Sequence, residues 1–514
     1  MKPPKTDWNR LAKDSLDEAL QLTYNTNLAK NIILFIGDGM GVSTITAARI
    51  YKGQKQNKPG EETILKFEEF PHLALSKTYG TDRQVPDSSQ TATALMAGVK
   101  TNFYVVGYND NVTEGDCEAE TEANKVKSIL HYFTDEGRST GVITTARLTH
   151  ATPASSYAHS ANRYWEYDAR VKKDTNGGSC KDIAYQLVYD NPDIQVAMGG
   201  GRTMFLPNTT TDQEDQTKGK RGDNRDLTNE WQTMQYNKSR KYKYVSNKGE
   251  FDAIDPATTD YVLGLFQSGH MQYEVERDQS SNGEPSLTEM TEKAIKILKK
   301  NSKGFFLMVE GARIDHGHHD TTAKKALIET LSMESAVIKA KELTNEEDTL
   351  IIVTADHSHV FNVGGYPYRG NDILGLAHPL QYQPSLDNLP YTTLSYGNGP
   401  GYNLDGSREN LTNVDTASIT YVQQSAVPVA SESHGGEDVP IYASGPMSHL
   451  IHGVKEQHYV GHVMQYASCV GRYSDNCDRR VTNPYVTCSK GYGLIYNKSV
   501  LYISLSIVLL LMFY

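Results

Sequence analysis

Short, continuous apolar runs alternate along this chain with longer segments whose apolar positions recur at helical spacing. The runs lie at 31–36, 141–145, 304–309 and 348–354. Such runs are typical of strands that are buried on both faces. Helical spacing predicts helices at 42–51, 125–137, 181–190, 288–300 and 323–343. The alternation predicts an α/β fold: a doubly wound, mostly parallel central sheet with helices on both faces.

The remaining segments divide the chain into an arm, a main domain and an insertion. Residues 8–22 place Trp8, Leu11, Leu16, Ala19 and Leu20 near helical spacing, which predicts an amphipathic arm within residues 1–29. We assign residues 30–364 to the main domain, in which the polar segment 205–250 is interpreted as a surface excursion. Residues 365–432 are rich in Gly, Pro, Tyr, Asn and Ser and predict an inserted small crown subdomain. A strand at 439–442 and a helix at 458–469 predict a return to the main domain over 433–487.

The 514-residue chain is acidic, with a formal net charge of −11. Non-specific binding to a nucleic-acid scaffold requires a basic surface, so this balance argues against such a partner. A small phosphate-bearing substrate stays compatible with it, because bound metal cations can reverse the local field of an acidic protein.

The C-terminal segment 488–514 has the order of a glycolipid-anchor signal. Small residues around Cys488 precede a polar spacer that contains Asn497 and Lys498, and residues 500–514 form an uncharged apolar tail. In such signals the tail is removed and the new end is joined to lipid, which predicts a GPI-anchored protein. The alternative is an apolar terminal strand or helix that docks on the domain. The N-terminal sequence Met-Lys-Pro-Pro-Lys does not match a secretion signal.

Glycosylation acceptors and cysteines bear on the compartment. Asn-x-Ser/Thr triplets begin at Asn111, Asn208, Asn237, Asn410 and Asn497, as in a secreted chain. Five cysteines without a Cys-x-x-Cys motif leave two alternatives. These are two disulfides with Cys488 unpaired in an oxidising compartment, or free thiols in the cytosol. The triplets favour the oxidising compartment.

Metal-ligating side chains follow the predicted strands. Asp38 follows the first strand, Glu310 ends the 304–309 strand, and Asp356 and His357 follow the 348–354 strand; His150 and Thr152 come shortly after the 141–145 strand. In open α/β sheets, ligands bind beyond the carboxyl ends of the strands. A single aspartate after a strand is usually a helix cap or a turn former. Four strand ends that all carry such groups favour a metal site instead.

The segment 309–320 holds the densest cluster of such residues. Asp315 and His319 are four residues apart, so on a helix they share a face and can bind one ion. Mixed aspartate and histidine ligands suit Zn²⁺, whereas an all-oxygen shell suits Mg²⁺. His316 and His318 are interpreted as exposed or supporting groups, and His434 lies in a separate glycine-rich turn.

Ser88 follows the turn formers Pro86 and Asp87 and precedes a helical pattern that begins at Ser89. A helix N-terminus offers free backbone N–H groups and the positive end of the dipole, both of which suit a phosphate. The alternative is that Ser88 is an ordinary N-cap serine.

Six segments together resemble the alkaline phosphatase family, in its animal, membrane-anchored form. They are GDGMGVSTITAARI, VPDSSQTATALMAGVK, VITTARLTHATPASSYAHSANR, VEGARIDHGHH, TADHSHVF and ESHGGED, and they fall in the order and spacing of the family between about residues 8 and 478. The resemblance implies hydrolysis of phosphate monoesters through a phosphoserine at Ser88, with Arg163 binding two phosphate oxygens. It implies one zinc ion held by Asp315, His319 and His434, and a second held by Asp38, Asp356 and His357. It also implies a magnesium ion held by Asp38, Thr152 and Glu310, with His150 in its outer shell.

The resemblance carries further expectations about ions, covalent links and partners. Animal members of the family have a calcium site, to which Phe266 and Asp278 correspond; Glu214 aligns loosely, and Gln267 replaces an acidic ligand. The implied disulfides are Cys117–Cys180 and Cys469–Cys477. The resemblance further implies a homodimer in which the N-terminal helix embraces the partner and Tyr366 reaches across, on the extracellular face of the plasma membrane. Ser89 stands where many relatives have Ala, and the rim within 425–433 also differs.

Four other kinds of protein compete with this interpretation. A phosphodiesterase of the same superfamily generally uses threonine and lacks this magnesium shell, and a related phosphoglycerate mutase is a further alternative. A sulfatase requires a Cys/Ser-x-Pro-x-Arg setting, which is absent around Ser88. In a non-catalytic surface protein we would expect at least one metal ligand to be lost, whereas every expected zinc and magnesium position carries a residue that can act as a ligand.

Overall fold

The computed structural model describes residues 7–175, 178, 180–378 and 384–476. Its centre is a ten-stranded sheet in the order β14-β2-β13-β8-β1-β7-β3-β4-β6-β5. The strands, in chain order, are β1 (Asn31–Gly37), β2 (His72–Lys77), β3 (Ser139–Arg147), β4 (Val196–Gly200), β5 (Tyr242–Val245), β6 (Tyr261–Leu265), β7 (Phe305–Gly311), β8 (Thr349–Ala355), β13 (Val439–Ser444) and β14 (Gly453–Glu456). β13 runs antiparallel to both of its neighbours, and the other pairings in this sheet are parallel. The prediction of a mostly parallel sheet is confirmed.

The central strand β1 shows why the sheet is covered on both sides. Ile33 and Phe35 belong to one hydrophobic cluster, whereas Ile32, Leu34 and Ile36 belong to another. Successive side chains of a strand point to opposite faces, so these clusters lie on opposite sides of the sheet. Each fully buried large apolar side chain contributes roughly 1.5–3 kcal/mol of transfer free energy, which makes this double burial the main stabilising feature of the fold.

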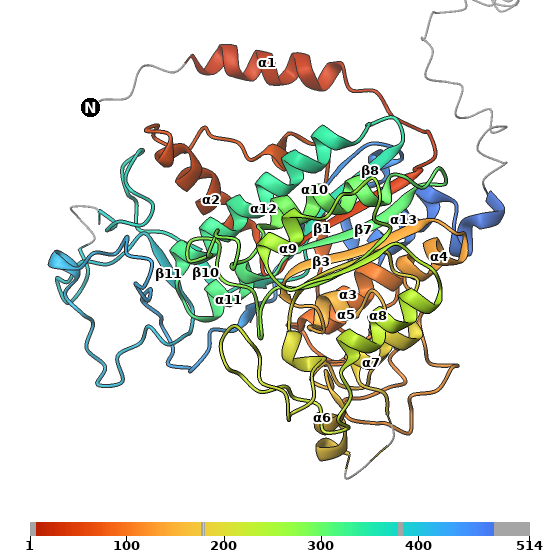
Figure 1. The fold of residues 1–514 in the computed structure, drawn as a ribbon. Coiled ribbons are helices and arrows are strands. Elements are labelled where there is room, and N and C mark those ends of the chain that lie inside the picture. The colour runs from red at the N-terminus through yellow and green to blue at the C-terminus, as the bar shows by residue number, and fades with distance from the viewer. Residues whose placement is uncertain (1–6, 176–177, 179, 379–383, 477–514) are drawn as a thin grey trace, which may run out of the picture.

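Two groups of helices form the outer layers (Figure 1). The first group packs on the face of Ile33 and comprises α2 (Val42–Lys55), α10 (Leu287–Leu298) and α12 (Ala323–Leu343). The second packs on the opposite face and comprises α3 (Ser88–Ala97), α4 (Ile129–Asp135), α8 (Leu227–Asn237) and α13 (Tyr459–Ser468). The shorter helices are α5 (Ala151–Ala154), α6 (Asp168–Asp174), α7 (Ile183–Tyr185), α9 (Lys248–Asp252) and α11 (Arg313–His319).

Some predicted elements differ in extent from the observed ones. The helix predicted over 125–137 is reduced to α4, because Ser128 caps it by accepting the N–H of His131 and Lys125 pairs with Tyr108 in a β-bridge. The helix predicted over 181–190 begins as α7 and continues as a π-helical turn over Gln186–Asp190. The segment 205–250 is more than a surface excursion, since it supplies the edge strand β5.

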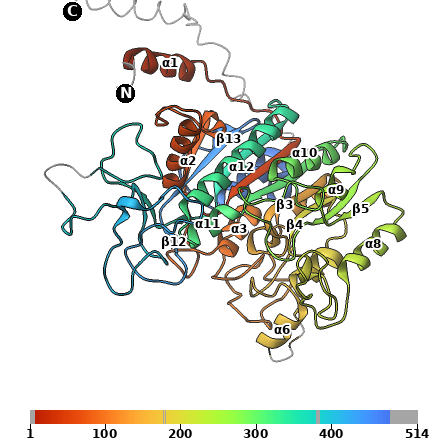
Figure 2. The same cartoon turned by 60° about the vertical axis from the view of Figure 1, so that its left-hand side comes forward.

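The predicted N-terminal arm is the helix α1 (Trp8–Leu20), which has no buried residue. Figure 1 shows it standing away from the body of the molecule. Its apolar side chains are exposed, with Trp8 63% and Leu20 76% accessible. Residues 365–432 contain little regular structure beyond β11 (Leu394–Tyr396), which pairs with β10 (Phe361–Val363). Figure 2 shows these loops gathered on one side of the sheet, beside α2 and α11.

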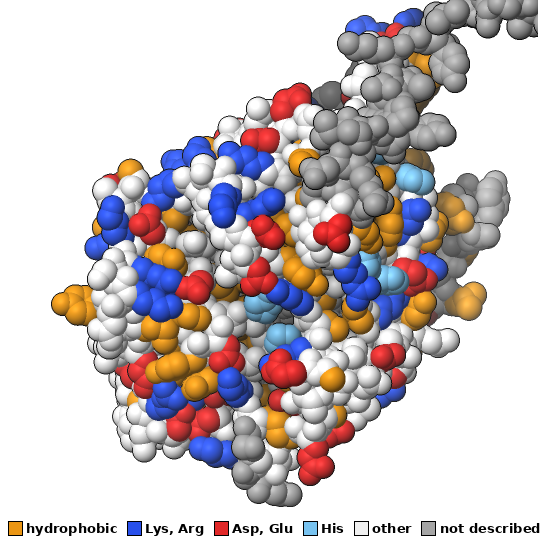
Figure 3. Space-filling model, turned by 90° about the vertical axis from the view of Figure 1, so that its right-hand side faces the viewer, with side chains coloured by type: hydrophobic (Ala, Val, Ile, Leu, Met, Phe, Trp, Pro, Cys, Tyr) orange, Lys and Arg blue, Asp and Glu red, His pale blue; other side chains and the backbone are white. Residues whose placement is uncertain are grey.

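The structure shows where several residues singled out in the sequence lie. Cys117 and Cys180 form a disulfide, whereas Cys477, Cys488 and Asn497 lie outside the described residues. The other acceptor asparagines, Asn111, Asn208, Asn237 and Asn410, are all exposed. Basic and acidic side chains are mixed on the face shown in Figure 3. Among the described helices, none combines the length and the apolar character needed to cross a membrane.

Candidate active site

Four strands of the sheet bring the predicted metal ligands to one edge. In the order β8-β1-β7-β3, neighbouring strands end side by side, with Ile36 opposite both Thr354 and Glu310. Asp38 therefore emerges from β1 between Asp356, which follows β8, and Glu310 of β7. Two short strands, β9 (Ser358–His359) and β12 (His434–Gly435), pair antiparallel and carry further histidines to the same edge.

Asp315, His319 and His434 converge as the first group. His319 Nε2 lies 3.3 Å from Asp315 Oδ1, His434 Nε2 lies 3.5 Å from the same oxygen, and the two nitrogens are 3.2 Å apart. A tetrahedral zinc ion with bonds of about 2.0–2.2 Å holds its ligand atoms roughly 3.3–3.6 Å apart. The three atoms are therefore spaced as one zinc ion requires.

Asp38, Asp356 and His357 form the second group. His357 Nε2 lies 3.4 Å from Asp38 Oδ1 and 3.2 Å from Asp356 Oδ2. All three side chains are fully buried. The hydroxyl oxygen of Ser88 lies 3.3 Å from the same Nε2 atom of His357, so this group adjoins the predicted nucleophile.

The histidines of both groups are held in the orientation that metal ligation requires. His319 Nδ1 contacts the carbonyl of Glu432, His434 Nδ1 lies 2.7 Å from the carbonyl of Pro86, and His357 Nδ1 lies 3.3 Å from the carbonyl of Ser358. A ring whose Nδ1 donates to a carbonyl presents the lone pair of Nε2. In each case Nε2 is the atom that faces the group of carboxylates.

Asp38, Glu310 and His150 form a third group, and Thr152 adjoins it. Both carboxylate oxygens of Asp38, Oε1 of Glu310, Oγ1 of Thr152 and Nδ1 of His150 are buried without a hydrogen-bond partner. Buried polar atoms are nearly always paired, so adjacent oxygens that have no hydrogen-bond partner in the protein are suited to hold a cation. The oxygen-rich donor set suits Mg²⁺.

Four buried carboxylates lie close together at this edge of the sheet. Asp38, Glu310 and Asp356 are inaccessible and Asp315 is 3% exposed. Burial, together with repulsion from Asp356 and Asp315, raises the pKa of Asp38 well above its usual value. Burial also raises the pKa of Glu310 to about 7. Ionised carboxylates are unstable in such surroundings unless cations balance them, so the residues present fit the implied metals.

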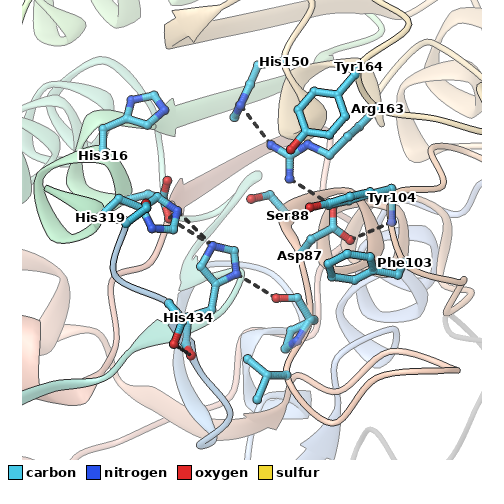
Figure 4. Close-up of a pocket in the computed structure, with 15 residues that line it drawn as sticks. Asp87, Ser88, Phe103, Tyr104, His150, Arg163, Tyr164, His316, His319 and His434 are labelled. Carbon is cyan, nitrogen blue, oxygen red and sulfur yellow. Dashed lines mark hydrogen bonds and ion pairs between the residues drawn. The ribbon is translucent and has the colours of Figure 1, made fainter. Parts of the chain in front are cut away.

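Ser88 is the first residue of α3 and is 2% exposed. The N-cap is Asp87, whose carboxylate accepts the backbone N–H groups of Ser89 and Gln90. The alternative in which Ser88 serves as the cap is therefore excluded, and its hydroxyl is free to face the cleft (Figure 4). Phosphate placed there meets the positive end of the helix dipole.

Arg163 lines the same cleft, on the side of Ser88 away from His434 (Figure 4). Its Nη1 lies 3.0 Å from Asp87 Oδ2, and its Nη2 lies 2.9 Å from His150 Nε2. Although burial disfavours the charged guanidinium, the Asp87 carboxylate holds the pKa of Arg163 above its usual value. The arginine is thus a fixed cation in the cleft that Ser88 also lines.

Comparison with known proteins identifies the family. The family model described as alkaline phosphatase matches residues 29–470. The chain is 51% identical over 476 residues to the tissue-nonspecific alkaline phosphatase of Rattus norvegicus, covering 91% of this chain and 90% of the relative. The chain belongs to the alkaline phosphatase family. It is thus a hydrolase that acts on phosphate monoesters.

The chain is also similar to other alkaline phosphatases, in sequence or in fold. The human tissue-nonspecific isozyme is 50% identical over 482 residues, covering 93% of this chain and 90% of the relative. The alkaline phosphatase of Gadus morhua is 48% identical over 476 residues, covering 91% and 98%. The alkaline phosphatase structure from Thermus thermophilus, at 21% identity and a TM-score of 0.61, covers 86% of this chain and 92% of that one, and shares the fold.

Two residues of this phosphatase site were missed by the sequence reasoning. His359 Nε2 lies 2.9 Å from Asp315 Oδ1, and its Nδ1 contacts the carboxylate of Glu432. Burial alone would lower the pKa of His359, but Glu432 and Asp315 raise it to about 10. His359 is therefore a positively charged support for Asp315. The sequence signal that could have indicated His359 was its position two residues after His357 in TADHSHVF.

The supporting histidines of α11 are buried or half-buried, so the exposed alternative is excluded for them. His318 is inaccessible, with Nε2 2.9 Å from Thr44 Oγ1 and Nδ1 2.8 Å from the Tyr396 hydroxyl. His316 Nδ1 lies 2.9 Å from Arg313 Nη1, and its ring packs against His150 and His270.

The group expected to bind calcium does not fit that ion. Gln267 Nε2 lies 3.1 Å from both Glu214 Oε1 and Glu284 Oε1, and Arg202 Nη2 lies 2.8 Å from Glu214 Oε2. An amide NH₂ and a guanidinium therefore already satisfy the carboxylates that a cation would need. Asp278 is not brought to this group: it is exposed and its carboxylate accepts the N–H of Ser280. Glu284 stands in its place, and burial raises its pKa to about 7.

Proposed function

We propose that this chain hydrolyses phosphate monoesters in two steps, through a phosphoserine at Ser88, with two zinc ions and one magnesium ion. The observation that carries the proposal is the position of Ser88 Oγ. It lies at the N-terminus of α3, 3.3 Å from His357 Nε2 and in one cleft with Arg163. The three groups described above are assigned to these ions.

Asp315, His319 and His434 would hold the first zinc ion, and Asp38, Asp356 and His357 would hold the second. Asp38, Glu310 and Thr152 would hold the magnesium ion, with His150 beyond them. When bound, these cations supply positive charge that lowers the pKa of hydroxyl groups and stabilises the negative oxygens of the reacting phosphate.

Ser88 loses its hydroxyl proton to solvent water, and Oγ forms a bond to phosphorus as the bond from phosphorus to the ester oxygen breaks. The departing alkoxide takes up a proton from solvent and leaves as an alcohol. A water molecule that has lost a proton to solvent then attacks phosphorus, the bond from phosphorus to Oγ breaks, and Oγ takes up a proton, which releases inorganic phosphate and restores Ser88. Throughout, Arg163 and the backbone N–H of Ser88, which Asp87 does not take up, bind the non-bridging oxygens of the reacting phosphate.

This chemistry favours alkaline solution. The Ser88 hydroxyl and the attacking water must both lose protons. The imidazoles of His319, His357 and His434 must be neutral to serve as ligands.

Substitution of Ser88 tests the proposal. Ser88→Ala should lower kcat for p-nitrophenyl phosphate by at least about a thousandfold, while zinc and magnesium content per chain stays unchanged. Ser89→Ala is the matched control and should retain most of the turnover, because the Ser89 hydroxyl bonds to Asp87 at 2.6 Å and Ser89 does not line the cleft. Undiminished turnover by Ser88→Ala would refute the assignment. Turnover of bis(p-nitrophenyl) phosphate comparable to that of the monoester would indicate a phosphodiesterase.

We further propose that the protein is a homodimer on the extracellular face of the plasma membrane, held by a lipid anchor. The exposed apolar side chains of α1 and the 69% exposed Tyr366 support the dimer. The Cys117–Cys180 disulfide and the exposed acceptor asparagines support an oxidising compartment. Release of activity from cell membranes by a phosphatidylinositol-specific phospholipase would test the anchor, and sedimentation of the released enzyme would test the dimer.

A further inference from the structure

The cleft at Ser88 has two walls of different chemistry. It has a volume of about 460 Å³. One wall is polar and carries His319 and His434; the other carries Phe103, Tyr104 and Tyr164. Figure 4 shows the three aromatic residues beside Asp87 and Arg163, across the cleft from His319 and His434. We call Phe103, Tyr104 and Tyr164 the aromatic wall.

The rings of the aromatic wall form a continuous surface. The centroids of Phe103 and Tyr104 are 4.0 Å apart, and those of Tyr104 and Tyr164 are 5.2 Å apart at an interplanar angle of 75°. Tyr164 is 39% exposed, and the other two rings are half-buried. Rings that are partly open in this way offer faces and edges to a further ring, which prefers offset or edge-to-face contact.

The aromatic wall is joined directly to the groups that would bind phosphate. Tyr104 donates its backbone N–H to Asp87 Oδ1 at 3.1 Å, and its carbonyl accepts the N–H of Arg163 at 2.8 Å. Tyr164 follows Arg163 in the chain, and the Arg163 guanidinium carbon lies 5.7 Å from the Tyr164 ring centre. The atoms of the leaving group that lie next to the phosphate are therefore expected to contact the aromatic wall.

Tyr104 also adopts a conformation that a bulky residue rarely adopts. Its φ angle is +62°, in the left-handed region that glycine occupies without cost. Strain of this kind persists where the surrounding structure fixes it, and it is found most often at functional sites. The ring of Tyr104 is thus kept in the cleft at a cost in backbone energy.

We propose that the aromatic wall binds the leaving group, so that the enzyme prefers monoesters in which an aromatic ring is joined directly to the phosphate oxygen. Phenyl phosphate and phosphotyrosine belong to this class, whereas glycerol phosphates do not. The proposal rests on the proposed function, because Ser88 fixes where the phosphate lies. A planar ring attached to the ester oxygen then contacts Tyr104 and Tyr164.

Competitive inhibition separates ring binding from the intrinsic reactivity of aryl esters. Benzylphosphonate and ethylphosphonate carry the same CH₂ group next to phosphorus and differ in the ring. Wild-type enzyme should bind benzylphosphonate more tightly, and this preference should fall about three- to tenfold in Tyr104→Gly. Glycine suits the positive φ of this position, so the variant is expected to fold. Tyr104→Phe and Tyr164→Phe, which keep the rings, should retain the preference.

The same comparison is then made with substrates, as the ratio of kcat/KM for phenyl phosphate to that for glycerol 2-phosphate. Tyr104→Gly and Tyr164→Ala should each lower this ratio. Tyr236→Ala should leave it unchanged, because Tyr236 is 72% exposed on α8. Equal ratios in wild type and both cleft variants would overturn the proposal, even with Ser88-dependent activity intact. Activity that survives Ser88→Ala would instead overturn the proposed function.

Discussion

Arg163 and Asp87 form a buried ion pair, with Nη1 3.0 Å from Oδ2. The same carboxylate oxygen accepts the hydroxyl of Ser89 at 2.6 Å, and the carboxylate caps α3 through the N–H groups of Ser89 and Gln90. One side chain therefore fixes both the helix that presents Ser88 and the guanidinium that faces it. Displacement of either would disturb the other.

Asp87→Asn tests this dual role. The amide oxygen can still cap α3, but the charge that balances Arg163 is lost. Loss of one partner of a buried ion pair should lower the free energy of unfolding by about 3 kcal/mol. Inhibition by inorganic phosphate should weaken severalfold, because Arg163 is no longer held in place. Denaturant unfolding and the inhibition constant measure the two effects, and an unchanged inhibition constant would contradict the positioning role.

Removal of the metals should destabilise the protein as well as inactivate it. Chelation leaves the carboxylates of Asp38, Glu310, Asp315 and Asp356 buried together without cations. The melting temperature should fall by several degrees. The fall should be larger at alkaline pH, because burial raises the pKa values of Asp38, Glu310 and Asp356 and these carboxyl groups then ionise as the pH rises. Calorimetry with elemental analysis checks this. Zinc and magnesium together should restore both properties, and calcium alone should restore neither.

The hydrogen bonds of Gln267 to Glu214 and Glu284 predict that calcium does not stabilise this chain. Millimolar calcium should leave the melting temperature of the wild type unchanged within the scatter of replicate scans. Gln267→Glu replaces the amide that binds Glu214 and Glu284 by a third carboxylate, so calcium should stabilise this variant by mass action. Adding Asp278→Asn to that variant should not alter the response. A calcium-dependent rise in the melting temperature of the wild type would show that the Gln267 amide does not prevent calcium from binding.

The buried carboxyl group of Glu329 makes the free energy of unfolding depend on pH. It is 3% exposed, and burial raises its pKa to about 7 in the folded state. The folded protein keeps a proton that the unfolded chain releases, so the contribution of Glu329 is fully present below about pH 4.5 and is lost as the pH rises to about 7. Glu329→Gln should therefore stabilise the protein more at pH 8.5 than at pH 5.5, by on the order of 2 kcal/mol.

Thermal unfolding of both proteins at the two pH values measures this difference. Glu329 accepts the N–H of Glu274, and the amide oxygen of glutamine can accept the same bond. An equal effect of the substitution at both pH values would contradict the assigned pKa.

The long buried strands and the ligands that follow them were predictable from the sequence. Asp38, Glu310 and Asp356 stand at the ends of continuous apolar runs, and parallel strands must end at a common edge. Asp315 and His319 were predictable because helix geometry places residues four apart on one face. In both cases a local pattern sufficed, because the geometry of a strand or helix converts spacing into position.

Contacts between distant segments left no such pattern. His359 meets Glu432 because β9 pairs with β12, and neither two-residue strand has a detectable period. Glu284 rather than Asp278 shares the Gln267 amide with Glu214, because the irregular segment between β6 and α10 places it there. The N-cap role of Asp87 was ambiguous, because aspartate and serine both cap helices well.

Asp38 belongs to two of the three cation groups, with Asp356 and His357 on one side and His150 and Glu310 on the other. An ion bound on either side would draw one carboxylate oxygen toward itself and orient the second oxygen for the other ion. Filling of the two positions would thus be linked through a single side chain. Titration of the apoprotein with metal would give a sigmoidal rise in activity, and scarcity of one ion would weaken retention of the other.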